Sequence, residues 1–332
     1  MAILRRKSDL LGRFEDAVRV GGWNLLYLSK DKHPSRYSIT RDGERYTVRA
    51  FIWNITHGGK SRAKDEYRIQ ITGVTEFSRE TDARNLILGW WEDVGVFAGW
   101  DFRQHVGAVS SSPSMQVSEG ALRQALATGF APYVNQNGET AIAVRPDFMG
   151  TYIQYLEPLH DSGRVPAEAE ILAKISEDPD EVADSEIDSG VAPPRKIAIV
   201  STKRALRALD FNRRVLSAYA HQCAMCGTQL RLVDGAHILP VAHGDSTDET
   251  SNGVALCALH HRAYDRGLVA FDATGKVAIN EKLVKKLKDD DRAGGLAKFR
   301  ENLRPVLIIP ADKRDRPRGK FVDAANALRD WA

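Results

Sequence analysis

The three cysteines of this 332-residue chain all fall in one short segment, at Cys223, Cys226 and Cys257. Two residues separate Cys223 from Cys226, and two separate Cys257 from His260. This spacing lets two side chains reach one ion from a single turn, and three thiolates with one imidazole form a standard tetrahedral set for zinc. We therefore predict a structural Zn²⁺ site at these four residues, with the adjacent His261 as the alternative fourth ligand. The pattern uses every cysteine, which excludes a disulfide scaffold.

The residues between and after the cysteine pairs form a recognisable pattern. Ala236-His237-Ile is followed one residue later by Pro240, Asn252-Gly leads to Leu-Cys257, and His260-His261 closes the motif. This combination resembles the HNH endonuclease family, in its zinc-stapled, restriction-endonuclease-like branch. The resemblance extends from Cys223 to about Leu268, under a sixth of the chain. It implies a ββα-metal fold, in which a β-hairpin, a loop and a helix hold one divalent ion, and it implies DNA as the substrate.

The resemblance also implies catalytic roles for His237, Asn252 and His261. A neutral imidazole titrates near working pH, so His237 suits the general base that deprotonates the attacking water. A divalent ion, Mg²⁺ or alternatively Mn²⁺ or Ni²⁺, stabilises charge on the leaving oxygen, and His261 is a candidate ligand for it. Asn252 corresponds to the family's middle Asn, which orients the loop and the base histidine or alternatively contacts the metal.

One position departs from the family pattern, because many members carry Asp directly before the first histidine and this chain has Ala236. Asp265 and Asp234 are the two candidates for the missing carboxylate ligand of the catalytic ion. Asp265 follows His261 by four residues, so the two share one face of a helix. Asp234 precedes His237 by three residues, which places it on the opposite face of a regular strand. We therefore favour Asp265.

Charge is distributed unevenly along the chain. Residues 157–194 carry 2 basic and 11 acidic side chains, whereas residues 195–332 carry 25 basic and 16 acidic side chains. Low hydrophobicity with like charge predicts a mobile acidic linker over 161–194, between an N-terminal domain at 1–160 and the nuclease domain at 195–332. The basic excess fits a polyanion partner such as DNA. Candidate phosphate contacts are Arg204, Arg207, Arg213, Arg214, Arg262, Arg266 and the tail Lys313–Lys320.

The N-terminal domain has no sharp motif. Aromatic and β-branched residues predict strands at Tyr46–Ile55 and Tyr67–Gly73, and Ser118 begins a predicted helix that ends at Gly129. The fold class is therefore α+β: a mixed α/β N-terminal domain joined to a C-terminal ββα-metal HNH domain with structural zinc. The aromatic strands of the N-terminal domain suit a DNA-recognition or specificity surface, or alternatively a hydrophobic core. The basic residues that accompany them are Arg45, Arg49, Lys60, Arg62, Lys64 and Arg68.

The function predicted from the sequence is a metal-dependent DNA endonuclease of restriction or defence. The alternatives are a catalytically silent, zinc-stabilised DNA-binding module and a mobile-element or toxin nuclease. A homodimer is expected if both strands of the duplex are cut, because each such site cuts one strand. The charged N-terminal sequence has no signal-peptide pattern and no apolar run is long enough to span a bilayer, so we expect a cytoplasmic protein with no membrane partner.

Overall fold

The computed structural model describes residues 4–29, 33–59, 62–110, 113–329 and 331. The chain divides into two compact units, Met1–Leu209 and Asp210–Ala332. The boundary lies within one long helix, α7 (Arg195–Ala218). Leu206 of this helix belongs to a core of the first unit, whereas Phe211 belongs to the core of the second. The unit boundary therefore lies later in the chain than residue 194, where the sequence predicted it.

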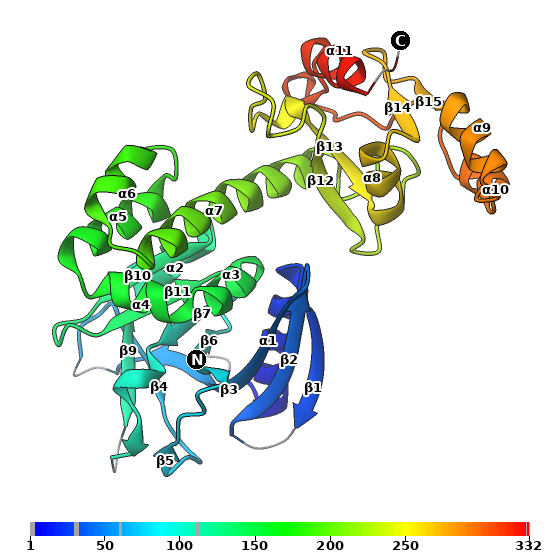
Figure 1. The fold of residues 1–332 in the computed structure, drawn as a ribbon. Coiled ribbons are helices and arrows are strands. Elements are labelled where there is room, and N and C mark those ends of the chain that lie inside the picture. The colour runs from blue at the N-terminus through cyan, green and yellow to red at the C-terminus, as the bar shows by residue number, and fades with distance from the viewer. Residues whose placement is uncertain (1–3, 30–32, 60–61, 111–112, 330, 332) are drawn as a thin grey trace. The chain divides into compact units, whose positions relative to one another are not determined.

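Within the described residues, nine strands of the first unit form one sheet. The order along its main path is β1-β2-β3-β6-β7-β11-β10, and β4 pairs with both β3 and β9 (Figure 1). Strand β6 runs parallel to β3 and is buried on both faces: Leu88 enters one core and Ile87 the other. The bounds are β1 Asn24–Ser29, β2 Ser35–Arg41, β3 Glu44–His57, β4 Glu66–Gln70, β6 Ala83–Trp91, β7 Val96–Trp100, β9 Ser114–Ser118, β10 Phe130–Val134 and β11 Thr140–Val144, with a separate short pair β5 Glu76–Phe77 and β8 Gly107–Ala108.

Helices of the first unit pack on this sheet. Helix α2 (Glu119–Thr128) begins where the Ser118 hydroxyl accepts a hydrogen bond from the amide of Ala121, and it ends at Gly129, whose φ of 111° suits glycine. Both ends match the sequence prediction. The other helices are α1 Lys7–Val20, α3 Met149–Gln154, α4 Leu156–Gly163, α5 Pro166–Glu177 and α6 Asp184–Gly190, with 3₁₀ turns at Phe102–Gln104 and Pro146–Phe148.

The acidic segment 161–194 differs from the mobile linker that the sequence predicted. It contains all of α5 and all of α6, and it buries Leu172, Ile175 and Ile187 in a core of the first unit. These apolar side chains are spread among many carboxylates. The mean hydropathy of the segment is therefore low and does not indicate that they are buried. The segment is therefore a folded part of the first unit.

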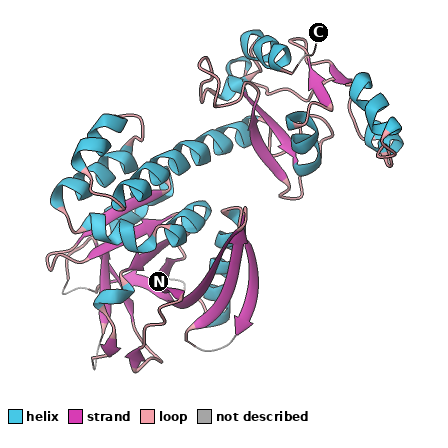
Figure 2. Cartoon of the chain, in the orientation of Figure 1, coloured by secondary structure: helices cyan, strands magenta, loops and turns pink. Residues whose placement is uncertain are grey.

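The second unit contains the ββα arrangement that the sequence predicted (Figure 2). Strands β12 (Val233–His237) and β13 (Gly253–Cys257) pair antiparallel, and α8 (Ala258–Asp265) follows β13 directly. The register places His237 opposite Gly253. The remaining elements are β14 Val269–Phe271, β15 Val277–Ile279, α9 Glu281–Asp289, α10 Leu296–Glu301 and α11 Gly319–Leu328, with 3₁₀ turns at Thr250–Asn252 and Lys313–Asp315.

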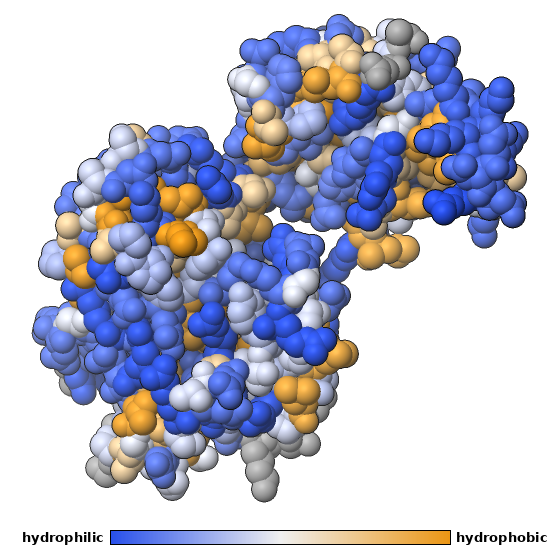
Figure 3. Space-filling model, in the orientation of Figure 1, coloured by the Kyte–Doolittle hydropathy of each residue, from blue (hydrophilic) through white to orange (hydrophobic). Residues whose placement is uncertain are grey.

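The face of each unit that Figure 3 shows is mainly polar. Hydrophilic residues cover most of the visible face of each, and apolar residues appear there in separate patches (Figure 3). None of the described helices has the length and apolar character needed to cross a bilayer.

Candidate metal centre and active site

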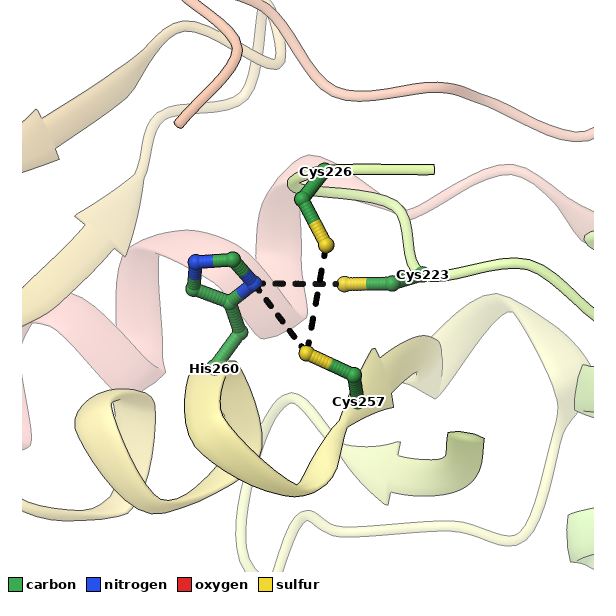
Figure 4. A group of neighbouring side chains, drawn as sticks. All are labelled: Cys223, Cys226, Cys257 and His260. Carbon is green, nitrogen blue, oxygen red and sulfur yellow. Dashed lines mark hydrogen bonds between the residues drawn. The ribbon is translucent and has the colours of Figure 1, made fainter. Parts of the chain in front are cut away.

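Three cysteines and one histidine gather at the start of α8 (Figure 4). Their ligand atoms all lie within 4.8 Å of one another. The Sγ atoms of Cys226 and Cys257 are 3.9 Å apart, and Nδ1 of His260 lies 3.5 Å from Sγ of Cys223 and 3.3 Å from Sγ of Cys257. Tetrahedral zinc, with bonds of about 2.0–2.3 Å, separates its ligand atoms by roughly 3.3–3.8 Å. The cluster therefore fits zinc.

Backbone hydrogen bonds shape the turn that presents the first two cysteines. The amide of Cys223 donates to the carbonyl of Thr228, and the amide of Gly227 donates back to the carbonyl of Cys223. Gly227 has a φ of +80°, which a residue with a side chain rarely adopts. The amide of Ala224 donates to the carbonyl of Ala255 in β13, which brings the turn beside the strand that carries the third cysteine.

The ionisation of these groups suits a cation ligand set. Burial raises the pKa of the Cys223 thiol to about 12. Burial also opposes ionisation of Cys226, but hydrogen bonds with Thr228 and the neighbouring thiols outweigh it, so the pKa of Cys226 is lowered. Burial lowers the pKa of His260 and keeps its ring neutral. A divalent cation favours the thiolate form and binds neutral imidazole, so it compensates for burying these groups together.

His237 ends strand β12, and its side chain is 19% exposed. Its ring stacks on Phe211 of α7, with centroids 3.7 Å apart and planes 10° apart. Its Nε2 lies 2.9 Å from Oδ1 of Asp248, in the loop between β12 and β13. Phe211 thus fixes the plane of the predicted base, and Asp248 contacts one of its two ring nitrogens. The side chain of His237 remains accessible to solvent.

Asn252 is fully buried, just before β13. Its Oδ1 accepts a hydrogen bond from the amide of Leu239, and its Nδ2 donates to the carbonyls of Leu239 and Thr247 and to the hydroxyl of Ser246. All of these partners belong to the loop that follows β12. Of the roles predicted for Asn252, the described contacts correspond to orienting the loop.

His261 and Asp265 share one face of α8, as their spacing predicted. Nε2 of His261 lies 3.7 Å from Oδ2 of Asp265, and both side chains are accessible. Asp234 is exposed on β12. Throughout the part of the chain that the structure describes, the cysteine–histidine cluster is the only group of three or more His, Cys, Asp or Glu side chains with ligand atoms this close together. Among the described His, Cys, Asp and Glu side chains, the structure thus brings together two candidate ligands for a catalytic ion and places no third this close to them.

Several arginines predicted to contact DNA are paired with carboxylates. Asp210 binds both Arg213, at 2.8 Å, and Arg214, at 2.7 Å, and Arg207 forms an ion pair with Asp180. Arg214 also donates to Thr250 and to the carbonyl of residue 248, so it supports the loop beside His237. The other members of the predicted set, Arg204, Arg262 and Arg266, are exposed.

The basic residues noted in the first unit are partly structural. Arg49 is buried and donates to Asn85 at 2.6 Å, and Arg68 donates to the carbonyl of Gly58. Arg45, Arg62 and Lys64 are exposed, and Lys60 lies outside the described residues.

In the basic tail of the second unit, Arg318 forms an ion pair with Glu249 at 2.9 Å.

Sequence reasoning missed three residues around the predicted base: Phe211, Asp248 and Arg214 in its role as a loop support. Phe211 is one apolar position of helix α7, and nothing in its spacing marks it as a neighbour of His237. Asp248 is one of three acidic residues in the loop between His237 and Asn252, and no spacing distinguishes it from the others. Only the path of the loop brings it to the imidazole.

A hairpin and a helix joined at a Cys₃His cluster, with a histidine at the end of the first strand, define a ββα-type domain with a candidate metal site. Residues 223–272 match the HNH endonuclease family. The chain therefore carries an HNH endonuclease domain, as the sequence motif indicated. Residues 46–153 match a second family, described as methylase-associated X1.

No curated protein matches the chain. Among solved structures, a chain described as a modification-dependent TagI restriction endonuclease is similar at 12% identity. The match covers 91% of this chain and 87% of that one, with a TM-score of 0.30.

Proposed function

We propose that the protein is a metal-dependent DNA endonuclease with His237 as the general base. The observation that carries this proposal is the imidazole at the end of β12, in an HNH domain, accessible to solvent and held by Phe211 and Asp248. A neutral ring so placed can accept a proton from an attacking water. His261 and Asp265 would hold a divalent ion, Mg²⁺ or Mn²⁺ or Ni²⁺, with water and phosphate oxygens completing its coordination. When bound, that ion stabilises charge on the leaving oxygen.

The Cys₃His cluster has a different role in this proposal, because its four donors leave no open position for substrate. Zinc there fixes the start of α8, and with it the two side chains that would hold the catalytic ion. Exposed Arg262 and Arg266 follow on the same helix and its end, where they can neutralise phosphates.

We further propose that the first unit selects the DNA and that the biological role is restriction or defence, with a homodimer as the form that cuts both strands. The description of the family that matches residues 46–153, methylase-associated, supports this role. A mobile-element or toxin nuclease is the competing role. The genes beside this one separate the two: a methyltransferase or defence genes support restriction, and an intron or an immunity gene supports the alternative.

Cleavage of supercoiled plasmid in Mg²⁺ or Mn²⁺ tests the activity, on methylated and unmethylated DNA. We expect the wild type to cut and His237→Ala to lose roughly 10²–10⁴-fold in rate, as removal of a general base does. His243→Ala is the matched control, because His243 is a partly exposed histidine of the neighbouring loop. Absence of cutting on every substrate by folded, zinc-loaded wild type would instead support the catalytically silent DNA-binding module.

A further inference from the structure

The contact between His237 and Asp248 is not among the contacts that the sequence predicted. The carboxylate Oδ1 lies 2.9 Å from Nε2 of the ring, and the two residues are eleven positions apart in the chain. We propose that Asp248 is a positioning residue that fixes which nitrogen of His237 faces the attacking water. This inference rests on the proposed endonuclease function.

The loop is built to hold Asp248 in this place. Nη2 of Arg214 donates to the backbone carbonyl of Asp248 at 2.7 Å, and Nη1 donates to Oγ1 of Thr250 at 2.9 Å. On the other side, Nδ2 of Asn252 donates to the carbonyl of Thr247 at 2.9 Å. Buried or charged donors therefore hold the backbone carbonyls of Thr247 and Asp248 and the side chain of Thr250. These bonds reduce the conformational freedom that the contact must overcome.

The chemistry follows from the two nitrogens of imidazole. A carboxylate accepts hydrogen bonds, so the neutral ring donates Nε2–H to Asp248 and Nδ1 keeps the lone pair. Nδ1 is then the nitrogen that can accept a proton from water. Once the ring is protonated, the carboxylate stabilises the imidazolium, as the third member of a nucleophile–base–orienter arrangement does. Stacking on Phe211 fixes the ring plane, so the two contacts together set the direction of Nδ1.

The loop offers a matched control. Asp245 is another aspartate of the same loop, 90% exposed, and it lies 3.8 Å from a different imidazole, that of His243. Asp248→Ala removes the carboxylate but keeps the backbone carbonyl that Arg214 binds. Asp248→Glu returns a carboxylate to the position.

Two measurements on the zinc-loaded, full-length protein test the proposal. The first is proton NMR of the imidazole N–H groups without DNA, with His237→Ala to assign the signal. We expect a downfield, slowly exchanging Nε2 proton in wild type and Asp245→Ala, and its loss in Asp248→Ala. The second is plasmid cleavage, in which we expect Asp248→Ala to lower kcat about 100-fold at unchanged KM and Asp248→Glu to recover part of the rate.

Each contrary result has a distinct meaning. A signal that persists in Asp248→Ala, or cleavage that is unaffected by the substitution, would overturn the proposal. Recovery of the rate at raised Mg²⁺ would assign Asp248 to ion binding instead. A wild type that cuts no DNA, yet shows the signal and loses it in Asp248→Ala, would overturn the endonuclease function while leaving the positioning of His237 by Asp248 in place.

Discussion

Asn252 supports the loop that follows β12 through four hydrogen bonds of its fully buried side-chain amide, which accepts one and donates three. Asn252→Ala leaves the amide of Leu239 without its partner in the interior, and it leaves the carbonyl of Leu239 with the hydroxyl of Ser246 alone. We expect a loss of roughly 2–4 kcal/mol in the stability of the second unit, because unsatisfied buried polar groups keep their desolvation cost. Urea unfolding followed by circular dichroism measures it.

Ser246→Ala is the control for this prediction. It removes one of the four bonds of Asn252 and the bond that the Ser246 hydroxyl donates to the carbonyl of Leu239. Because it leaves the other three bonds of Asn252 in place, it should cost less. If Asn252→Ala abolished cleavage without changing the unfolding midpoint, the side chain would act in the chemistry rather than in the loop.

The sequence predicts a residue well when local spacing determines its surroundings. The Cys₃His cluster follows from two short spacings, and the pairing of His261 with Asp265 follows from one helical turn. The contact of Asp248 with His237 depends on the path of a loop, and the support that Arg214 gives depends on where that loop meets α7. Neither role can be predicted from sequence spacing. The arginines predicted as phosphate contacts illustrate the same limit: charge along the chain does not reveal which carboxylate, such as Asp210, lies beside each of them.

At the scale of elements, β13 approaches α7 closely at Gly253. A Cβ at this position would overlap the side chain of Val215 and press on Phe211, although the φ of −117° would suit any residue. We expect Gly253→Ala to destabilise the second unit by about 1–3 kcal/mol, because the strand must move away from the helix. Thermal unfolding measures the effect. Gly244→Ala is the control, because nothing lies near its added Cβ, and equal stability of the two variants would contradict the close packing.

A second element-scale prediction concerns Glu92, in the turn after β6. The Arg5 guanidinium donates to it at 2.6 Å and, with Trp90 and Arg13, lowers its pKa from the ordinary 4.5 to about 2, although burial opposes the shift. A carboxyl with a lowered folded pKa contributes stability above its unfolded pKa and loses that contribution as pH falls toward the folded value. We therefore expect the first unit to lose stability between pH 4.5 and about 2.

Glu92→Gln should flatten this part of the pH profile, as measured by urea unfolding at several pH values. Glu76→Gln, at an exposed carboxylate of the same unit, should leave the profile as in wild type. A profile unchanged by Glu92→Gln would show that the contact with Arg5 contributes nothing to the acid sensitivity.

In the acidic segment 161–194, the charge pattern along the sequence does not show which residues form ion pairs with one another across helices. Glu168 of α5 binds Arg195 at 2.7 Å, and Asp184 of α6 binds Lys203 at 2.6 Å. The acidic block and the basic start of α7 are thus partners across packed helices. Helix ends and strands of the first domain were predictable because caps and alternation are local, whereas this pairing is a property of tertiary structure.

At the scale of the whole molecule, the two units have separate cores, and the described metal-ligand cluster belongs to the second. Zinc binding to such clusters is coupled to folding, with apparent free energies of about 10–16 kcal/mol in small zinc domains. Chelation should therefore unfold residues 210–332 and leave the unfolding transition of residues 1–209 near its original temperature. Differential scanning calorimetry before and after treatment with a chelator measures both transitions.

Two additions make the zinc experiment specific. Adding Zn²⁺ back should restore the lost transition, whereas Mg²⁺ alone should not, because thiolates prefer the softer ion. Cys226→Ser should reproduce the effect of the chelator. If chelation left both transitions in place, the cluster would hold the fold together without metal. If it shifted both equally, the cores of the two units would unfold as one, and α7, which contributes to both, would be the element through which they are coupled.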